Sequence, residues 1–181
     1  MKKIVYLFVL AFLFASCEKE DVGGTATQDM AGQWYVHVDA VDENGDLVYS
    51  DDELYGIGNF LILTYNTSDN SSDKMFVDDL ESFWDFKVKT SCNLNDKSFG
   101  EDEFAENLKY ECGVKITEGS IMYDVATTPS GMPADSIVFY VEFDDDYTEV
   151  DEDVFEYTPA VYGFAKYRIS GYRYTGFALD D

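Results

Sequence analysis

The first candidate for acid–base chemistry in this 181-residue chain is its one histidine, His37. It falls between Val36 and Val38, on the face of a predicted strand that points away from Trp34. A general base needs a nucleophile and an orienting group within reach, and the chain has no Gly-x-Ser-x-Gly motif. With 37 acidic residues, a carboxylate-dependent hydrolase remains an alternative. The sequence identifies no catalytic residue and favours a binding protein over an enzyme.

Four residues have the spacing of a calcium loop: Asp42, Asn44, Asp46 and Glu53 occupy its positions 1, 3, 5 and 12. The sixth position, which such a loop gives to glycine, holds Leu47. Asn-Gly at 44–45 between two apolar runs is a strong hairpin signal and explains the same residues as an acidic turn. The turn is the favoured interpretation, Ca²⁺ binding is the alternative, and no other cofactor is expected.

Two cysteines of the folded domain, Cys92 and Cys112, lie on the apolar parity of their predicted strands. In an oxidising compartment, two inward cysteines on neighbouring strands favour a disulfide, provided that their Cα atoms lie within about 7 Å. The alternative is two buried free thiols that pack as small apolar side chains. No Cys/His set has the spacing of a zinc site.

The N-terminus predicts export. Lys2 and Lys3 precede an apolar run over 4–14 that is too short to span a bilayer as a helix. Small residues close the run before a cysteine. Residues 1–16 are therefore interpreted as a signal peptide, and residues 17–29 as Cys17 followed by a flexible acidic tether.

The residues around the cleavage site also point to a lipid anchor. Phe14-Ala15-Ser16-Cys17 resembles the lipobox of bacterial lipoproteins, and the acidic residues over 18–21 resemble the surface-export signal of Bacteroidetes lipoproteins. The resemblance implies attachment to a membrane through acylated Cys17. It favours the outer membrane and leaves open whether the protein is exposed at the cell surface.

The formal net charge of −25 excludes several kinds of partner. Nucleic-acid binding rests on Lys and Arg that neutralise phosphates, so this surface would repel it. A basic patch on an anionic leaflet is excluded for the same reason. Aromatic residues make up 17% of the chain, which supplies enough apolar surface for the core of one domain.

Period-two alternation of apolar and polar residues predicts strands throughout residues 30–181. A weak helical pattern covers 102–108, and 68–73 and 144–153 are the most loop-like tracts. Few helices and about eight strands predict an all-β domain, an antiparallel barrel or sandwich, with at most one short helix. The strands are expected at 34–41, 47–49, 58–65, 84–89, 110–116, 120–126, 137–143 and 161–177, the last being long enough to bend or break at Gly171.

Both ends of the domain resemble a known family. Ala31-Gly32-Gln33-Trp34 places Gly-x-Trp at the head of the first strand, which is similar to the opening of lipocalins and other calycins. The ending over 170–177, Ser-Gly-Tyr-Arg-Tyr-Thr-Gly-Phe, resembles that of small Bacteroidetes lipoproteins known as the "lipid-binding putative hydrolase" family. The resemblance covers nearly the whole mature chain. It implies a single calycin-like β-barrel with an apolar cavity, and it brings no catalytic motif that maps onto this sequence.

The sequence and the resemblance together predict noncovalent binding of a small apolar or amphipathic ligand. The candidate ligand-binding residues are Trp34, Trp84, Tyr167, Arg168 and Arg173. Trp34 would brace the barrel, and one of the arginines would meet a ligand carboxylate at the mouth of the cavity. The alternative is an accessory or adhesion subunit of a cell-surface complex, which would contact a protein partner and have no ligand cavity.

Ser136 is a candidate modification site. Asp135-Ser136-Ile137 resembles the three-residue O-glycosylation motif of exported Bacteroidetes proteins. The resemblance implies a sugar on the Ser136 hydroxyl.

Overall fold

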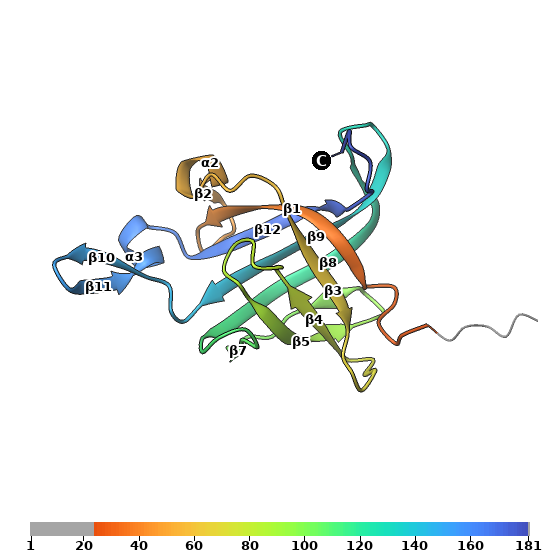
Figure 1. Ribbon diagram of the computed structural model, residues 1–181, viewed down its shortest axis with the longest axis horizontal. Coiled ribbons are helices and arrows are strands. Elements are labelled where there is room, and N and C mark those ends of the chain that lie inside the picture. The colour runs from red at the N-terminus through yellow and green to blue at the C-terminus, as the bar shows by residue number, and fades with distance from the viewer. Residues whose placement is uncertain (1–23, 181) are drawn as a thin grey trace, which may run out of the picture.

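The computed structural model describes residues 24–180, and its main body is one closed antiparallel β-barrel (Figure 1). Hydrogen-bonded neighbours follow the order β1, β3, β4, β5, β6, β8, β9, β12, and β12 pairs again with β1 to close the ring. The predicted all-β barrel of about eight strands is confirmed. The barrel strands are β1 (Gly32–Val41), β3 (Phe60–Asn66), β4 (Lys74–Asp78), β5 (Lys87–Asn93), β6 (Ser98–Phe99), β8 (Gly113–Thr127), β9 (Pro133–Phe143) and β12 (Lys166–Arg173).

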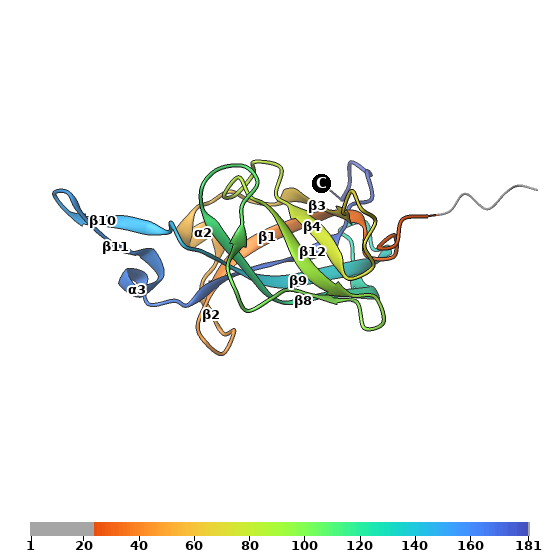
Figure 2. The same cartoon turned by 90° about the horizontal axis from the view of Figure 1, so that it is seen from below.

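Shorter elements extend the barrel. β2 (Leu47–Tyr49) pairs with β1, and β7 (Ala105–Glu106) pairs with β8. Figures 1 and 2 show β10 (Tyr147–Asp151), β11 (Val154–Tyr157) and α3 (Thr158–Tyr162) as an arm that projects from one end of the barrel. We name this end, which also carries α2 (Asp51–Leu54), the mouth. The described chain enters the barrel at the opposite end. Within residues 24–180, every helix falls short of the length and apolarity that a membrane crossing requires.

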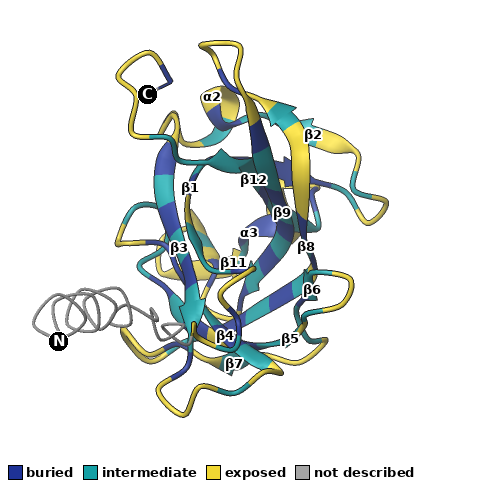
Figure 3. Ribbon diagram, turned by 90° about the vertical axis from the view of Figure 1, so that its right-hand side faces the viewer, coloured by how far each residue is buried: buried dark blue, intermediate teal, exposed yellow. Residues whose placement is uncertain are grey.

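Alternating side chains sort themselves between the barrel interior and its outer wall. On β1, Trp34, Val36 and Val38 are buried, while the side chain of His37 is 46% exposed on the wall, as predicted. Figure 3, a view from the end where the chain enters, shows buried and half-buried residues alternating along the strands. Each fully buried large apolar side chain stabilises the fold by about 1.5–3 kcal/mol.

The seam between β1 and β12 depends on Gly171. Eight residue pairs form this seam, from Trp34 opposite Arg173 to Val41 opposite Lys166. A Cβ atom at Gly171 would lie 2.1 Å from the Tyr35 carbonyl oxygen. Glycine therefore allows the two strands to approach closely, and β12 runs through this position without the predicted break.

The end of the barrel where the chain enters is closed around Trp34. The Trp34 indole N–H donates to the Thr64 hydroxyl at 2.8 Å, and Thr64 donates to the Met30 carbonyl oxygen at 2.6 Å. The Arg173 guanidinium lies 4.4 Å from the centre of the Trp34 ring, and it donates to the Ala31 carbonyl oxygen at 2.9 Å. The predicted bracing role of Trp34 agrees with this arrangement.

The predicted turn at Asn44-Gly45 is present, with Gly45 in the left-handed region at a φ of 83°. The predicted helical pattern over 102–108 is wrong. Phe104 and Leu108 are both exposed, so the spacing has no buried face behind it. Within residues 24–180 the helices are α2 and α3, one more than predicted, and β10 occupies half of the tract at 144–153 that was predicted as a loop.

The structure corrects the predicted disulfide, because Cys92 and Cys112 are both free thiols. Asn107 places Cys112 beside the first residue of β5: its side chain donates to the Cys112 sulfur at 3.6 Å and accepts from the Lys87 amide at 3.0 Å. Cys92 lies five residues further along β5, about 17 Å at the rise of a strand. A disulfide needs Cα atoms within about 7 Å.

Candidate functional site

Six aromatic side chains pack together at the mouth of the barrel. Trp84 stacks on Phe143 with ring centres 4.5 Å apart, and Phe83 meets Tyr167 edge-on at 5.2 Å. Each such pair adds about 0.5–1.5 kcal/mol beyond the area that it buries. We name the set Tyr55, Phe83, Trp84, Phe143, Phe164 and Tyr167 the aromatic cluster. The cluster forms the last layer of the core before solvent.

A buried carboxylate, that of Asp79, holds the loop that brings Phe83 and Trp84 into the cluster. One carboxylate oxygen accepts the backbone N–H groups of Glu81 and Phe86 at 3.1 and 2.9 Å. The other accepts those of Phe83 and Trp84 at 3.1 and 2.8 Å. Because Asp79 is fully buried, these four donors replace the water that its charge would otherwise require.

A chain of hydrogen bonds leads from the aromatic cluster to a second buried acid. Tyr167 donates its hydroxyl proton to the Asp146 carboxylate at 2.8 Å. The Tyr55 hydroxyl lies 2.8 Å from that of Tyr167 and must act as the donor, since the Tyr167 proton is already committed. Burial raises the pKa of Asp146, and the neighbouring charge of Asp145 acts in the same direction, against the hydrogen bonds from Thr158 and Tyr167. Burial also raises the pKa of the Tyr167 hydroxyl.

A cleft of about 600 Å³ opens between the barrel and the arm, and we name it the mouth cleft. A volume of this size is typical of sites for small molecules. Aromatic rings line much of the cleft, and their polar atoms are joined by the carboxylates of Glu53 and Asp146 and the hydroxyls of Thr148 and Thr158. Its lining residues are Tyr49, Glu53, Leu54, Tyr55, Trp84, Asp146, Tyr147, Thr148, Thr158 and Tyr162.

Local sequence signals place the walls of the mouth cleft. Ser50 and Glu53 form a reciprocal capping box that starts α2. α3 begins with Pro159 in its first turn and ends at Gly163, which takes the left-handed conformation at a φ of 77°. The Tyr49 hydroxyl donates to the carbonyl oxygen at the end of α3 at 3.1 Å, so it ties the barrel side of the cleft to the arm.

The structure separates the five predicted ligand-binding residues into three places. Trp84 and Tyr167 meet in the aromatic cluster at the mouth. Trp34 and Arg173 close the opposite end of the barrel. Arg168 lies on the outer wall, where it pairs with Asp39 at 2.7 Å. The predicted arginine at the mouth is therefore corrected, because strand parity turns Arg168 outward and Arg173 packs over Trp34.

His37 has partners that sequence reasoning missed. The Ser170 hydroxyl lies 3.3 Å from its Nε2, and an Asp39 carboxylate oxygen lies 3.5 Å from the same nitrogen. A Ser-His-Asp relay requires the serine and the carboxylate on opposite ring nitrogens. Asp39 is also held by Arg168, so the geometry is that of a polar cluster on the barrel wall and not of a hydrolytic triad.

The structure does not bring the predicted calcium ligands together. The Asp42 carboxylate accepts the backbone N–H groups of Asn44 and Asp46 at 2.8 and 2.9 Å within the turn. Glu53 is engaged instead by the backbone N–H and hydroxyl of Ser50. These contacts account for the acidic turn and for the start of α2 without a cation.

The predicted glycosylation residue, Ser136, lies within β9, half-buried, and its hydroxyl donates to the Gly171 carbonyl oxygen at 3.0 Å. Its modification stays a prediction. A sugar on this oxygen would replace that hydrogen bond between neighbouring strands.

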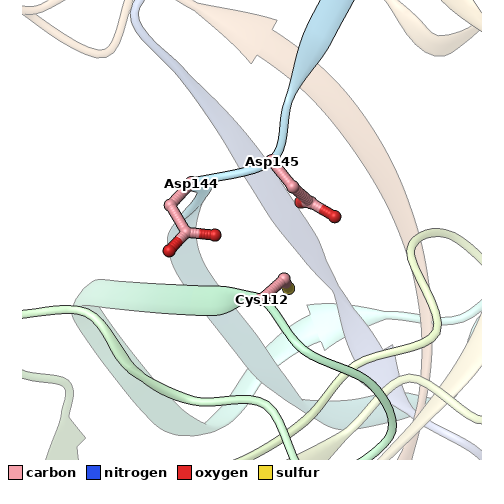
Figure 4. A group of neighbouring side chains, drawn as sticks. All are labelled: Cys112, Asp144 and Asp145. Carbon is pink, nitrogen blue, oxygen red and sulfur yellow. The ribbon is translucent and has the colours of Figure 1, made fainter.

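One group of metal-binding side chain types, Cys112, Asp144 and Asp145, lies within 4.8 Å among the described residues (Figure 4). The Asp145 carboxylate accepts from the Trp84 indole and the Tyr110 hydroxyl. Burial raises the pKa of the Cys112 thiol. Through its two hydrogen bonds, Asp145 braces Trp84 and Tyr110.

Sequence reasoning missed Tyr55, Phe83, Asp79 and Asp146 as parts of the site. Tyr55, Phe83 and Asp146 lie outside regular strands, so no periodicity marked them. The one local signal is Asp79 at the end of an apolar run and before a short non-periodic tract, where a carboxylate commonly accepts backbone amides in a turn.

The comparisons with known proteins add one finding. A family model with the description "Lipid-binding putative hydrolase" matches residues 19–178. No curated protein matches the chain.

Proposed function

We propose that this chain, which belongs to the "lipid-binding putative hydrolase" family, holds a small amphipathic molecule noncovalently in the mouth cleft. The main support for this proposal is the cleft itself, a space of about 600 Å³ that is lined by aromatic rings and by the buried acid Asp146. Aromatic side chains that offer apolar surface, together with fixed polar groups that orient the ligand, are typical of sites for small molecules.

The ligand would lie over the aromatic cluster and not along the barrel axis. Interior positions of the barrel carry fully buried side chains such as Phe86, Phe139 and Ile169. In an eight-stranded barrel, side chains alone can fill the interior. At the mouth, by contrast, Tyr147 and Tyr162 are about half-exposed, and their rings are available to a bound molecule.

The protein would act as a lipoprotein, attached to the outer membrane through acylated Cys17. This residue lies outside the described residues, and the proposal rests on the lipobox-like sequence and the acidic tether. The described chain enters the barrel opposite the mouth (Figure 1). An anchor before residue 24 would therefore be joined to the barrel at the end opposite the mouth cleft.

Native mass spectrometry of the purified chain tests the proposed binding. We expect one extra mass that organic solvent releases, and we expect the double variant Tyr147→Ala/Tyr162→Ala to lose it. Tyr123→Ala is the matched control, because Tyr123 is similarly exposed but bonds to Asp29 near the end where the chain enters. A bound mass that survives the double variant would contradict the mouth cleft as the site.

A further inference from the structure

We propose that the mouth cleft selects amphiphiles whose polar end is an alkylammonium cation, over carboxylates and neutral alcohols with the same chain. The inference rests on the proposed function and specifies the ligand class of the same cleft. Three observations support it: many of the lining residues are aromatic, the charged lining residues are acidic, and Lys166 and Arg168 on β12 form ion pairs away from the cleft.

Half of the ten lining residues are aromatic: Tyr49, Tyr55, Trp84, Tyr147 and Tyr162. The face of an aromatic ring attracts a cation, and tryptophan and tyrosine do so more strongly than phenylalanine. Several such rings around one space can surround an alkylammonium group, which has a large radius and weak hydration. The rings also accept the alkyl chain as an apolar contact.

The charged groups of the lining are both acidic. Glu53 and Asp146 are carboxylates, and none of the ten lining residues is Lys, Arg or His. A ligand carboxylate would therefore meet like charge, while a ligand ammonium would meet two opposite charges. The net charge of −25 adds an attraction for cations at longer range.

The cations on the last barrel strand are engaged away from the cleft. Lys166 pairs with Glu118 at 3.1 Å, and its amine lies 4.0 Å from the centre of the Tyr140 ring. Arg168 pairs with Asp39 at 2.7 Å on the outer wall. Neither side chain lines the mouth cleft, so the acidic groups there keep their charge available to a ligand.

Asp146 would be the group that recognises the cation. Asp146 is 3% exposed, and the Tyr167 hydroxyl donates to one of its carboxylate oxygens at 2.8 Å. A charge held in place at the wall of an aromatic space meets a ligand without reorganisation. Tyr162 and Tyr147, about half-exposed on the arm, would cover the opposite side of the ligand.

Isothermal titration calorimetry with three probes of equal chain length tests the selection: octyltrimethylammonium, octanoate and 1-octanol. The full chain would be titrated at pH 8, where carboxylates are charged. We expect octyltrimethylammonium to bind at least about tenfold more tightly than either other probe. Asp146→Asn should weaken the binding of octyltrimethylammonium about tenfold and change the affinity for 1-octanol less than about twofold. The retained binding of 1-octanol would also show that the variant is folded.

Salt provides a second measurement that needs no variant. Raising the NaCl concentration from about 20 to about 300 mM should weaken the binding of octyltrimethylammonium and leave the affinity for 1-octanol unchanged. Equal binding of octanoate or 1-octanol and the ammonium would overturn the selection. If Tyr162→Ala, but not Tyr123→Ala, abolished that equal binding, the proposed function would still stand. Failure of all three probes to bind would overturn both proposals.

Discussion

Replacing Asp79 with Asn should destabilise the protein and release the loop that carries Trp84. The Asp79 carboxylate accepts four backbone N–H groups at 2.8 to 3.1 Å, two on each oxygen. Asparagine keeps one oxygen and turns an NH₂ donor toward the other two amides. Each buried donor left without an acceptor costs about 1–3 kcal/mol. The free energy of unfolding should fall by about 3–5 kcal/mol, which lowers Tm by about 10 °C in a domain of this size.

Urea unfolding at pH 7, followed by circular dichroism and by tryptophan fluorescence, measures this loss. Asp96→Asn is the matched control, because Asp96 also accepts a backbone amide, that of Ser98, but in an exposed turn. We expect the control to change stability by less than about 0.5 kcal/mol. Equal stability of the two variants would refute the assignment of Asp79 as the organising group of the loop.

Three further predictions follow from the same contacts. Burial raises the pKa of Asp146 above 3.8, so its contribution to stability is largest at low pH and is lost as pH rises through the folded-state pKa. Asp146→Asn removes that titration, and the stability of the variant relative to wild type should rise with pH above about 4 and then level off; a difference that stays constant in urea unfolding from pH 4 to 8 would contradict it. Gly171→Ala should cost about 3 kcal/mol of unfolding free energy, because the added methyl group meets the Tyr35 carbonyl oxygen at 2.1 Å; a loss below about 1 kcal/mol would show that the seam can relax. In protein unfolded without reductant, Cys92 and Cys112 should both react with a thiol reagent because they are free. Labelling of neither cysteine would indicate a disulfide between them.

Strand parity made the barrel predictable. Along 34–38 and 137–143 buried residues alternate with more exposed ones, and the residue types alternate between apolar and polar in step with them. The turn at Asn44-Gly45 was predictable because its chemistry is local. β10 and β11 were missed because they form a two-stranded ribbon outside the barrel with most residues exposed, which leaves no alternation to detect.

The candidate site was less predictable, because its parts meet only when the barrel closes. Tyr167 reaches Phe83 and Trp84 across the mouth, although the segments are about 80 residues apart in sequence. Parity puts Tyr167 and Arg168 on opposite faces of β12, and the closed barrel decides that Tyr167 faces the core while Arg168 turns outward to Asp39. The position of Arg173 over Trp34 depends on the β1–β12 register, which single-strand patterns do not contain.

The outcome for the two cysteines shows a limit of the same reasoning. Cys92 and Cys112 both pack against the core from the faces that parity predicted. Asn107 joins the turn that contains Cys112, just before β8, to the first residue of β5, whereas Cys92 lies near the other end of β5. A side-chain contact between distant segments thus decides whether two inward thiols can meet.

The most direct test of the central claim is short-range quenching of tryptophan fluorescence by a brominated amphiphile, 12-bromododecanol. The two tryptophans lie at opposite ends of the barrel, Trp84 in the lining of the mouth cleft and Trp34 at the closed end. We predict saturable quenching in the wild type and none in Trp84→Phe, where Trp34 is the remaining emitter. Saturable quenching that persists in Trp84→Phe would place the ligand inside the barrel or at its closed end, and would contradict binding at the mouth.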